Sequence, residues 1–288
     1  MKTKINERGK SENSYPKIVK SFLGFLEGTG KSSSTVASYR YDLQCFEEFL
    51  KFRQKNFFAV NAKDFGAYLI WMEKEGFRIN TKRRKFLSAK ALVRYAVSRK
   101  KMPDRAVQFT KSPERLERLP WIPNSVQVQE VVARCSAESA LGARNRLILE
   151  LLSDTGMLVA ELCSLRWEDW DGEILHVTGK KPRSLRISEI SLELMKKWAQ
   201  HHAGKFIFPG YNRYGMQTEK MTSRGLELFV HHVATAAGMP QLKPKSLRHH
   251  AILRWIAEDQ SDQEIQKRLG VHKNYSLQSY RKYLERHP

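Results

Sequence analysis

The sequence has few cysteines, no long apolar segment and no apolar core near its N-terminus. Its three cysteines, Cys45, Cys135 and Cys163, lie far apart and without metal-ligand spacing, so we expect core thiols in a reducing compartment. No apolar run approaches the roughly 18 residues typical of a membrane-spanning helix. The first 17 residues are polar and unlike a signal peptide. These absences argue against integral membrane insertion and predict a cytoplasmic protein.

Acidic residues are also scarce relative to basic ones. The chain has 51 Lys and Arg against 30 Asp and Glu, a formal net charge of +21. Such a surplus is self-repelling unless a polyanion neutralises it, and nucleic acid is the commonest such partner. The surplus is uneven, because residues 1–120 hold 27 basic and 12 acidic residues and the remaining 168 hold 24 and 18. The first part is therefore the stronger candidate for electrostatic DNA binding.

The first part of the chain has the apolar spacing of amphipathic helices. Four helical stripes are predicted near 18–26, 36–50, 65–72 and 82–101, with a serine N-cap before the second. Prolines at 103, 113, 120 and 123 then interrupt any periodicity. We therefore predict an N-terminal helical DNA-binding domain over 1–110, a linker over 111–122 and a second domain over 123–288.

Two basic clusters bracket the fourth predicted helix. Clusters of this kind are often only a solvated face, but their position in a strongly basic domain favours contacts with DNA phosphates. The predicted DNA-binding residues are Lys82, Arg83, Arg84, Lys85, Lys90, Arg94, Arg99, Lys100 and Lys101.

The second domain reads as mainly helical with one strand-like region. Apolar residues alternate over 173–178 and 184–190, on either side of a turn at 179–182, which predicts a β-hairpin. Helices are expected before it, at 126–135, 144–154 and 158–165, and again from about 193 onward. The predicted fold class is mainly α with a small antiparallel sheet, in two domains.

Four short segments of the second domain occur in an informative order. TGMLVAEL stands at 155–162, GKKPRSLRI at 179–187, KSLRHHAI at 245–252 and LGVHKNYSLQSY at 269–280. In these segments and in the basic helical domain before them, the chain resembles the tyrosine recombinase (lambda-integrase-like) family, Xer type, over nearly its whole length. The resemblance implies a SAM-like core-binding domain, a catalytic-type domain and closure of both around duplex DNA.

The resemblance also implies roles for individual residues. DNA strand exchange without an energy source needs a nucleophile that keeps the energy of the broken phosphodiester bond in a covalent link to the protein. It also needs cations that stabilise the transition-state charge on the phosphate and an acid that protonates the leaving oxygen. By position, Tyr280 matches the nucleophile, although Tyr275 and Tyr283 lie close by in the sequence. The other residues with implied roles are Arg248 as a phosphate-binding arginine, Lys180 as general acid, Lys245, His249 and His272 as supporting groups, and Glu161 as a structural brace.

The pocket departs from the family pattern at two apolar positions. Leu158 stands where the family has its first phosphate-binding arginine, and Val271 stands where it has histidine or tryptophan. Lys245 replaces a histidine but keeps a cationic donor. Losing one preorganised donor typically costs about 3–4 kcal/mol of transition-state stabilisation. Arg166 and Arg183 are the two arginines that sequence alone suggests as substitutes for the missing one.

Two functions follow as hypotheses. The first is an active site-specific recombinase or integrase that uses a 3′-phosphotyrosine intermediate, without cofactor or metal. The second is a recombinase-derived DNA-binding accessory or regulatory protein with weak or absent cleavage. Both predict double-stranded DNA as partner, self-assembly from dimer to tetramer on DNA, and a possible partner recombinase or accessory protein. A general basic nucleic-acid-binding protein is a third, less specific interpretation, which would lack sequence preference in duplex binding.

Overall fold

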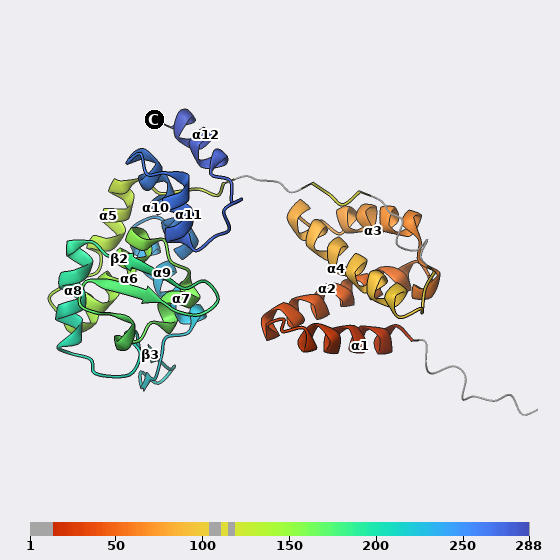
Figure 1. The fold of residues 1–288 in the computed structure, drawn as a ribbon, viewed down its shortest axis with the longest axis horizontal. Helices are drawn as coiled ribbons and strands as arrows, with labels where there is room; N and C mark the ends of the chain where they lie inside the picture. Colours follow the sequence, from red (N-terminus) through yellow and green to blue (C-terminus); the bar gives the residue numbers. More distant parts are fainter. Residues whose placement is uncertain (1–13, 104–110, 115–118, 288) are drawn as a thin grey trace, which may run out of the picture. The chain divides into compact units, whose positions relative to one another are not determined.

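The computed structural model of the 288-residue chain describes residues 14–103, 111–114 and 119–287. The chain divides into two compact units, Met1–Glu117 and Arg118–Pro288, called here the N-terminal and C-terminal units (Figure 1). Parts of the predicted first domain, residues 1–13 and 104–110, and part of the predicted linker, residues 115–118, lie outside the described residues. The exact domain bounds therefore stay a prediction.

The N-terminal unit is helical in its described residues, as the apolar spacing predicted. Pro16 stands in the first turn of its first helix, and the Ser32 hydroxyl accepts a hydrogen bond from a backbone N–H in the first turn of the second. Asn61 and Asp64 form a capping box at the start of the third. The helices are α1 (Tyr15–Gly28), α2 (Ser33–Phe52), α3 (Ala62–Lys74) and α4 (Ile79–Ser98), with a short 3-10 turn η2 (Phe57–Ala59) before α3.

A buried ionic group joins α2 to α4 inside this unit. Asp42 on α2 is 1% exposed, and its carboxylate accepts hydrogen bonds from Arg84 at 2.8 Å and from Ser88 at 2.9 Å. The Lys85 ammonium lies 3.7 Å from the same carboxylate. Because Lys85 is also 1% exposed, this pair is shielded from water on both sides.

The C-terminal unit is mainly helical, with two small antiparallel sheets. None of the described helices is long and apolar enough to span a membrane. Its helices are α5 (Ser125–Ala133), α6 (Ala140–Thr155), α7 (Val159–Ser164), α8 (Glu189–Ala199), α9 (Ser223–Ala236), α10 (Pro244–Ala257), α11 (Asp262–Leu269) and α12 (Gln278–Arg286), with a 3-10 turn η4 (Trp167–Asp169) after α7. Its strands are β1 (Ile174–Val177), β2 (Arg183–Arg186), β3 (Gly210–Tyr211) and β4 (Gln217–Thr218).

The predicted hairpin is confirmed, but its second strand ends sooner than predicted. β1 pairs with β2 from Ile174 opposite Arg186 to Val177 opposite Arg183. The predicted strand over 184–190 fails at its end because Ser188 caps α8, which begins at Glu189. The prediction of a single strand-like region was also wrong, since β3 and β4 form a second two-stranded sheet.

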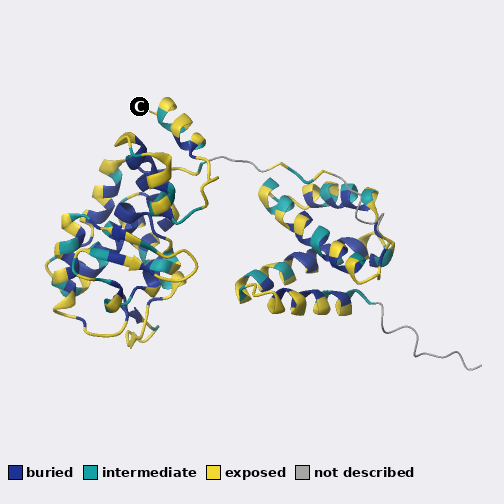
Figure 2. Cartoon of the chain, in the orientation of Figure 1, coloured by how far each residue is buried: buried dark blue, intermediate teal, exposed yellow. Residues whose placement is uncertain are grey.

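The C-terminal unit has two hydrophobic clusters. The larger one gathers side chains from α5 to the start of α10, including both strands of the first sheet. The smaller one is built by the last turns of α10 together with α11 and the start of α12, around Trp255 and Tyr280. Figure 2 shows buried positions on these last helices. The C-terminal segment is therefore packed into its own small core.

The buried group around Asp42 gives a test of the N-terminal fold. Asp42→Asn leaves the buried Lys85 ammonium without a counter-charge, so we expect the free energy of unfolding of this unit to fall by about 3–5 kcal/mol. Chemical denaturation followed by far-UV circular dichroism measures it. Glu47→Gln removes the pair with the exposed Lys51 and should cost at most about 0.5 kcal/mol. Equal losses in the two variants would contradict a structural role for the Asp42 charge.

Candidate functional site

Three side chains of the C-terminal unit are linked by hydrogen bonds into one group. The Tyr280 hydroxyl on α12 lies 2.7 Å from Nδ1 of His249 on α10. It also lies 3.1 Å from the hydroxyl of Tyr275, in the segment before α12. Sequence motifs predicted Tyr280 and His249 as site residues, and the folded chain brings them into direct contact.

His249 is a buried, neutral imidazole. Burial, reinforced by the positive charges of Lys245 and Arg248, lowers the pKa of His249 to about 4. Its Nε2 is buried and has no hydrogen-bond partner among the described residues. At neutral pH the ring is therefore uncharged, and its Nδ1 is available to accept the proton of a neighbouring phenol.

Tyr280 is held in the un-ionised form. Its side chain is 1% exposed and packs with Trp255 and Leu277 in the smaller cluster. Burial raises the pKa of Tyr280, and the hydrogen bond with Tyr275 raises it further, against a smaller opposing effect of Arg248. In this conformation the phenol is near its proton acceptor but shielded from solvent.

Arg248 on α10 is fixed by two backbone carbonyl groups. Its Nη1 donates to the carbonyl of Gly156, and its Nη2 donates to the carbonyl of Leu269 at 3.0 Å. Burial lowers the pKa of Arg248, and the nearby Glu161 carboxylate acts in the opposite direction. A guanidinium has five N–H groups. Within the described residues the other three have no hydrogen-bond partner, so the fork is rigid and still has donors to offer.

Glu161 on α7 binds a second arginine, Arg183 on β2. The Arg183 Nη1 and Nη2 atoms donate to the two Glu161 carboxylate oxygens, each at 2.8 Å. The backbone N–H of Leu158 donates to the same carboxylate at 2.7 Å. Burial raises the pKa of Glu161, but these hydrogen bonds lower it more, so the net shift is downward. The position where the resemblance expects an arginine thus adjoins the carboxylate that Arg183 neutralises.

The two arginines suggested as substitutes at this position lie in different surroundings. The Arg183 side chain is 3% exposed, and its Nε also donates to the carbonyl of Arg268 at 2.6 Å. Arg166 pairs with Glu168 at 2.8 Å, and its guanidinium lies over the ring of Phe206. Arg183 therefore belongs to the group around Glu161.

The remaining predicted catalytic residues, Lys180, Lys245 and His272, are exposed. Lys180 lies in the turn between β1 and β2, and Lys245 lies in the first turn of α10. His272 follows α11, and its Nδ1 accepts a hydrogen bond from the Asn274 backbone at 3.2 Å. In the part of the chain that the structure describes, neither lysine makes a hydrogen bond or ion pair, so both ammonium groups are available to a ligand.

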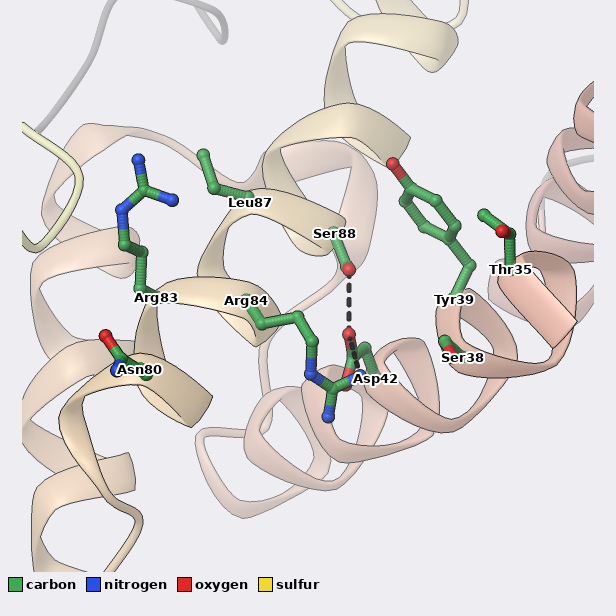
Figure 3. A pocket seen from close by; sticks show the side chains of 9 residues that line it. All are labelled: Thr35, Ser38, Tyr39, Asp42, Asn80, Arg83, Arg84, Leu87 and Ser88. Atoms are coloured by element: carbon green, nitrogen blue, oxygen red, sulfur yellow. Dashed lines mark hydrogen bonds and ion pairs between the residues drawn. The ribbon is translucent and has the colours of Figure 1, made fainter. Parts of the chain in front are cut away.

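The N-terminal unit has a second candidate site, a hollow between α2 and α4 (Figure 3). Tyr39 and Thr35 line it from α2, and Arg83, Arg84 and Leu87 line it from α4. A neighbouring hollow between α1 and α4 shares Tyr39 and Leu87 with the first. One face of α4 therefore runs along both.

The structure divides the nine predicted DNA-binding residues into three groups. Five line the hollows, and Lys100 and Lys101 are exposed just after α4. Lys82 is mostly buried and pairs with Glu73 at 3.4 Å. Lys85 points into the unit, with its ammonium 4.5 Å from the centre of the Tyr41 ring, so its predicted phosphate contact is not retained. The five that line the hollows are Arg83, Arg84, Lys90, Arg94 and Arg99.

Sequence reasoning did not assign a role to Tyr275. It noted this residue only as one of three neighbouring tyrosines, and the register of the last motif pointed to Tyr280. The signal that was available is a second phenol five residues upstream in the same motif. Only the folded segment shows that the two hydroxyl groups meet.

Two protein-family profiles match the chain, one in each unit. The profile of the phage integrase family matches residues 124–287. The chain belongs to the phage integrase family. The profile of the family's N-terminal SAM-like domain matches residues 19–100. The predicted resemblance and the predicted fold class are thereby confirmed.

Two relatives are tyrosine recombinases. XerC of Bacillus pumilus is 24% identical over 297 residues, which cover 94% of this chain and 96% of that protein. XerC of Myxococcus xanthus is 27% identical over 280 residues, which cover 91% of this chain and 92% of that protein. These integrase-family relatives match both units.

Solved structures share the fold. A lambda integrase tetramer bound to a Holliday junction has a TM-score of 0.74 at 16% identity, covering 94% of this chain and 78% of that one. The Tn1549 transposon integrase in complex with transposon right end DNA has a TM-score of 0.72 at 14% identity, covering 93% and 98%. At these identities the similarity establishes the fold alone.

The buried imidazole predicts how stability depends on pH. Because the folded-state pKa of His249 is about 4 and the ordinary value is 6.5, the unfolded chain binds more protons between these values. We expect the C-terminal unit to lose stability as the pH falls from about 6.5 to about 4, on the order of 3 kcal/mol from this group alone. Denaturation midpoints measured across that range test this.

His249→Gln should reduce this pH dependence, because it removes one of the two buried histidines on α10 whose pKa is lowered by burial, the other being His250. His232→Gln, which changes an exposed histidine on α9, should leave the dependence as in the unmodified chain. A His249→Gln profile as steep as that of the unmodified chain would contradict the assignment.

Proposed function

We propose that this protein is a tyrosine recombinase that cuts and rejoins double-stranded DNA through a 3′-phosphotyrosine intermediate on Tyr280. The observation that carries the proposal is the 2.7 Å hydrogen bond between the Tyr280 hydroxyl and Nδ1 of His249. His249 follows Arg248 directly in the sequence of α10. A nucleophile, a neutral proton acceptor and a fixed guanidinium thus lie in one place. The DNA complexes formed by the structural relatives support DNA as the substrate.

Each group has a proposed role in the cleavage step. The phenol oxygen of Tyr280 forms a bond to the scissile phosphorus, and its proton passes to His249 Nδ1. The bond from phosphorus to the 5′ oxygen breaks, and the Lys180 ammonium protonates that oxygen. The unpaired donors of Arg248, with Lys245 and His272 from the exposed rim, stabilise the charge on the phosphate oxygens. Rejoining reverses these steps and needs no metal or nucleotide.

The burial of Tyr280 adds a structural condition to this chemistry. Its side chain is 1% exposed, so the hydroxyl cannot reach a phosphate in this conformation. The segment 270–286 has to open toward solvent before attack, with the Tyr280 hydroxyl still in hydrogen-bonding reach of His249 Nδ1. We propose that DNA binding and assembly of copies from dimer to tetramer on DNA drive this shift, alone or with a partner recombinase or accessory protein.

DNA contacts of the N-terminal unit are proposed along the face of α4 that lines the two hollows. Arg83, Arg84 and Arg94 place guanidinium groups there, suited to phosphate contacts. Lys100 and Lys101 extend the positive surface past the end of the helix. Leu87 is 37% exposed at the junction of the hollows, an apolar group of the kind that meets a thymine methyl.

A second candidate function is a DNA-binding accessory or regulatory protein that cleaves weakly or not at all. The observation that favours it is Leu158, which is 49% exposed at the start of α7, where the resemblance expects a phosphate-binding arginine. An exposed leucine offers no donor to a phosphate oxygen. The two functions share their DNA contacts and differ in the covalent step.

The covalent step is tested with nicked suicide duplexes drawn from DNA flanking the coding region. We expect an SDS-resistant adduct that carries DNA on Tyr280, located by fragmentation of the tryptic peptide 274–281. Arg248→Ala should lower the initial rate of adduct formation on the order of 100-fold or more, because it removes a preorganised cation. Gel electrophoresis and peptide mass spectrometry provide the measurements.

Tyr280→Phe should remove the species linked at residue 280, and it retains the ring that packs in the core. Tight, sequence-selective binding without an adduct on any substrate would exclude the recombinase function and support the accessory function. Binding without sequence preference would exclude both.

The proposed DNA face of α4 is tested by salt dependence. Arg83→Ala with Arg94→Ala should weaken duplex binding and reduce the slope of log K against log salt by about 1.8, if each arginine contacts one phosphate. Fluorescence anisotropy titrations at several salt concentrations measure the slope. The matched control is Lys51→Ala with Lys74→Ala, which removes two exposed charges outside both hollows. An equal effect of the two double variants would contradict this face as the interface.

A further inference from the structure

The candidate pocket contains two adjoining phenols that differ in exposure. The Tyr275 and Tyr280 hydroxyl groups are 3.1 Å apart. Tyr275 is 37% exposed, whereas Tyr280 is 1% exposed and surrounded by core side chains. A phosphate that approaches from solvent in this conformation therefore meets the phenol of Tyr275 first.

The backbone of Tyr275 is anchored from two sides. Its N–H donates to the carbonyl of His272 at 2.8 Å, which closes a turn after α11. Its carbonyl accepts a hydrogen bond of 2.9 Å from Nε2 of Gln266, on α11. These contacts hold the residue beside the end of α11, where the Arg248 guanidinium binds the carbonyl of Leu269. The exposed phenol thus belongs to the pocket rather than to a free loop.

A proton route leads from Tyr275 to His249. When the Tyr280 hydroxyl donates to Nδ1 of His249, its oxygen is free to accept a hydrogen bond from the Tyr275 hydroxyl. The three groups then form a chain of two phenols that ends on a neutral imidazole. A proton lost from Tyr275 moves to Tyr280 as the proton of Tyr280 moves to His249.

We propose that Tyr275 is a second nucleophile of this pocket, able to attack the scissile phosphate in place of Tyr280, a role that rests on the proposed recombinase function. In that step the Tyr275 oxygen forms the bond to phosphorus, and the bond from phosphorus to the 5′ oxygen breaks. The proton of Tyr275 leaves along the chain to His249, and Lys180 protonates the 5′ oxygen. The product is a 3′-phosphotyrosine on residue 275 instead of 280.

The experiment compares the unmodified chain, Tyr275→Phe, Tyr280→Phe and the double variant on the same nicked suicide duplexes. We expect Tyr280→Phe to keep an adduct, slower on the order of 100-fold because the relay hydroxyl is lost, and we expect its DNA on Tyr275. Tyr275→Phe should keep the adduct on Tyr280, and the double variant should form none. Tyr283→Phe, the third tyrosine of this segment, is the matched control and should react like the unmodified chain.

An adduct in the unmodified chain that is absent from Tyr280→Phe would overturn the role of Tyr275 and leave the recombinase function intact. An adduct that persists in the double variant would overturn it as well. Absence of any adduct from the unmodified chain would overturn the recombinase function together with this role. The failure of the inference and the failure of the function are therefore distinguishable.

Discussion

The C-terminal end of α11 is the point on which the candidate pocket depends. The last carbonyl groups of a helix have no partner within it, and here Arg183 and Arg248 donate to the consecutive carbonyls of Arg268 and Leu269. The next residue, Gly270, has a left-handed backbone with φ of +62°, and a Cβ there would lie 3.0 Å from the Arg183 guanidinium. The guanidinium groups of Arg183 and Arg248 thus fix the corner, the chain turn at residues 268–270, after which the segment with Tyr275 and Tyr280 begins.

The contacts at this corner also show whether Arg183 can replace the phosphate-binding arginine that the resemblance expects at Leu158. Four donor contacts of Arg183 are already made, two to Glu161 and one each to the carbonyls of Arg268 and Lys181. A side chain that is 3% exposed and bound in this way neutralises the carboxylate and braces the corner. It has little left to offer a phosphate. In the proposed cleavage step, phosphate binding therefore falls to Arg248, Lys180 and Lys245.

The sequence predicted most of the helices and the family resemblance correctly, because both rest on local patterns of residues. It missed the β3–β4 sheet, whose two-residue strands are too short to show alternation. It also placed Lys85 on the DNA face, although the charge is buried against Asp42, 43 positions earlier. Nor could it choose between Arg166 and Arg183, since that choice depends on which carboxylate each one meets. For Lys85 and for Arg183 a partner far away in the sequence decided the outcome.

The placement of Tyr280 sets an energetic relation between binding and chemistry. Withdrawing a large side chain from the cluster around Trp255 costs about 1.5–3 kcal/mol of hydrophobic burial. In the proposed function, contacts made only when DNA is bound have to offset this cost. A complex whose contacts fall short of it holds DNA without cutting. The two candidate functions therefore differ in whether DNA contacts supply the free energy that releases Tyr280 from its cluster, and not only in the arginine that Leu158 replaces.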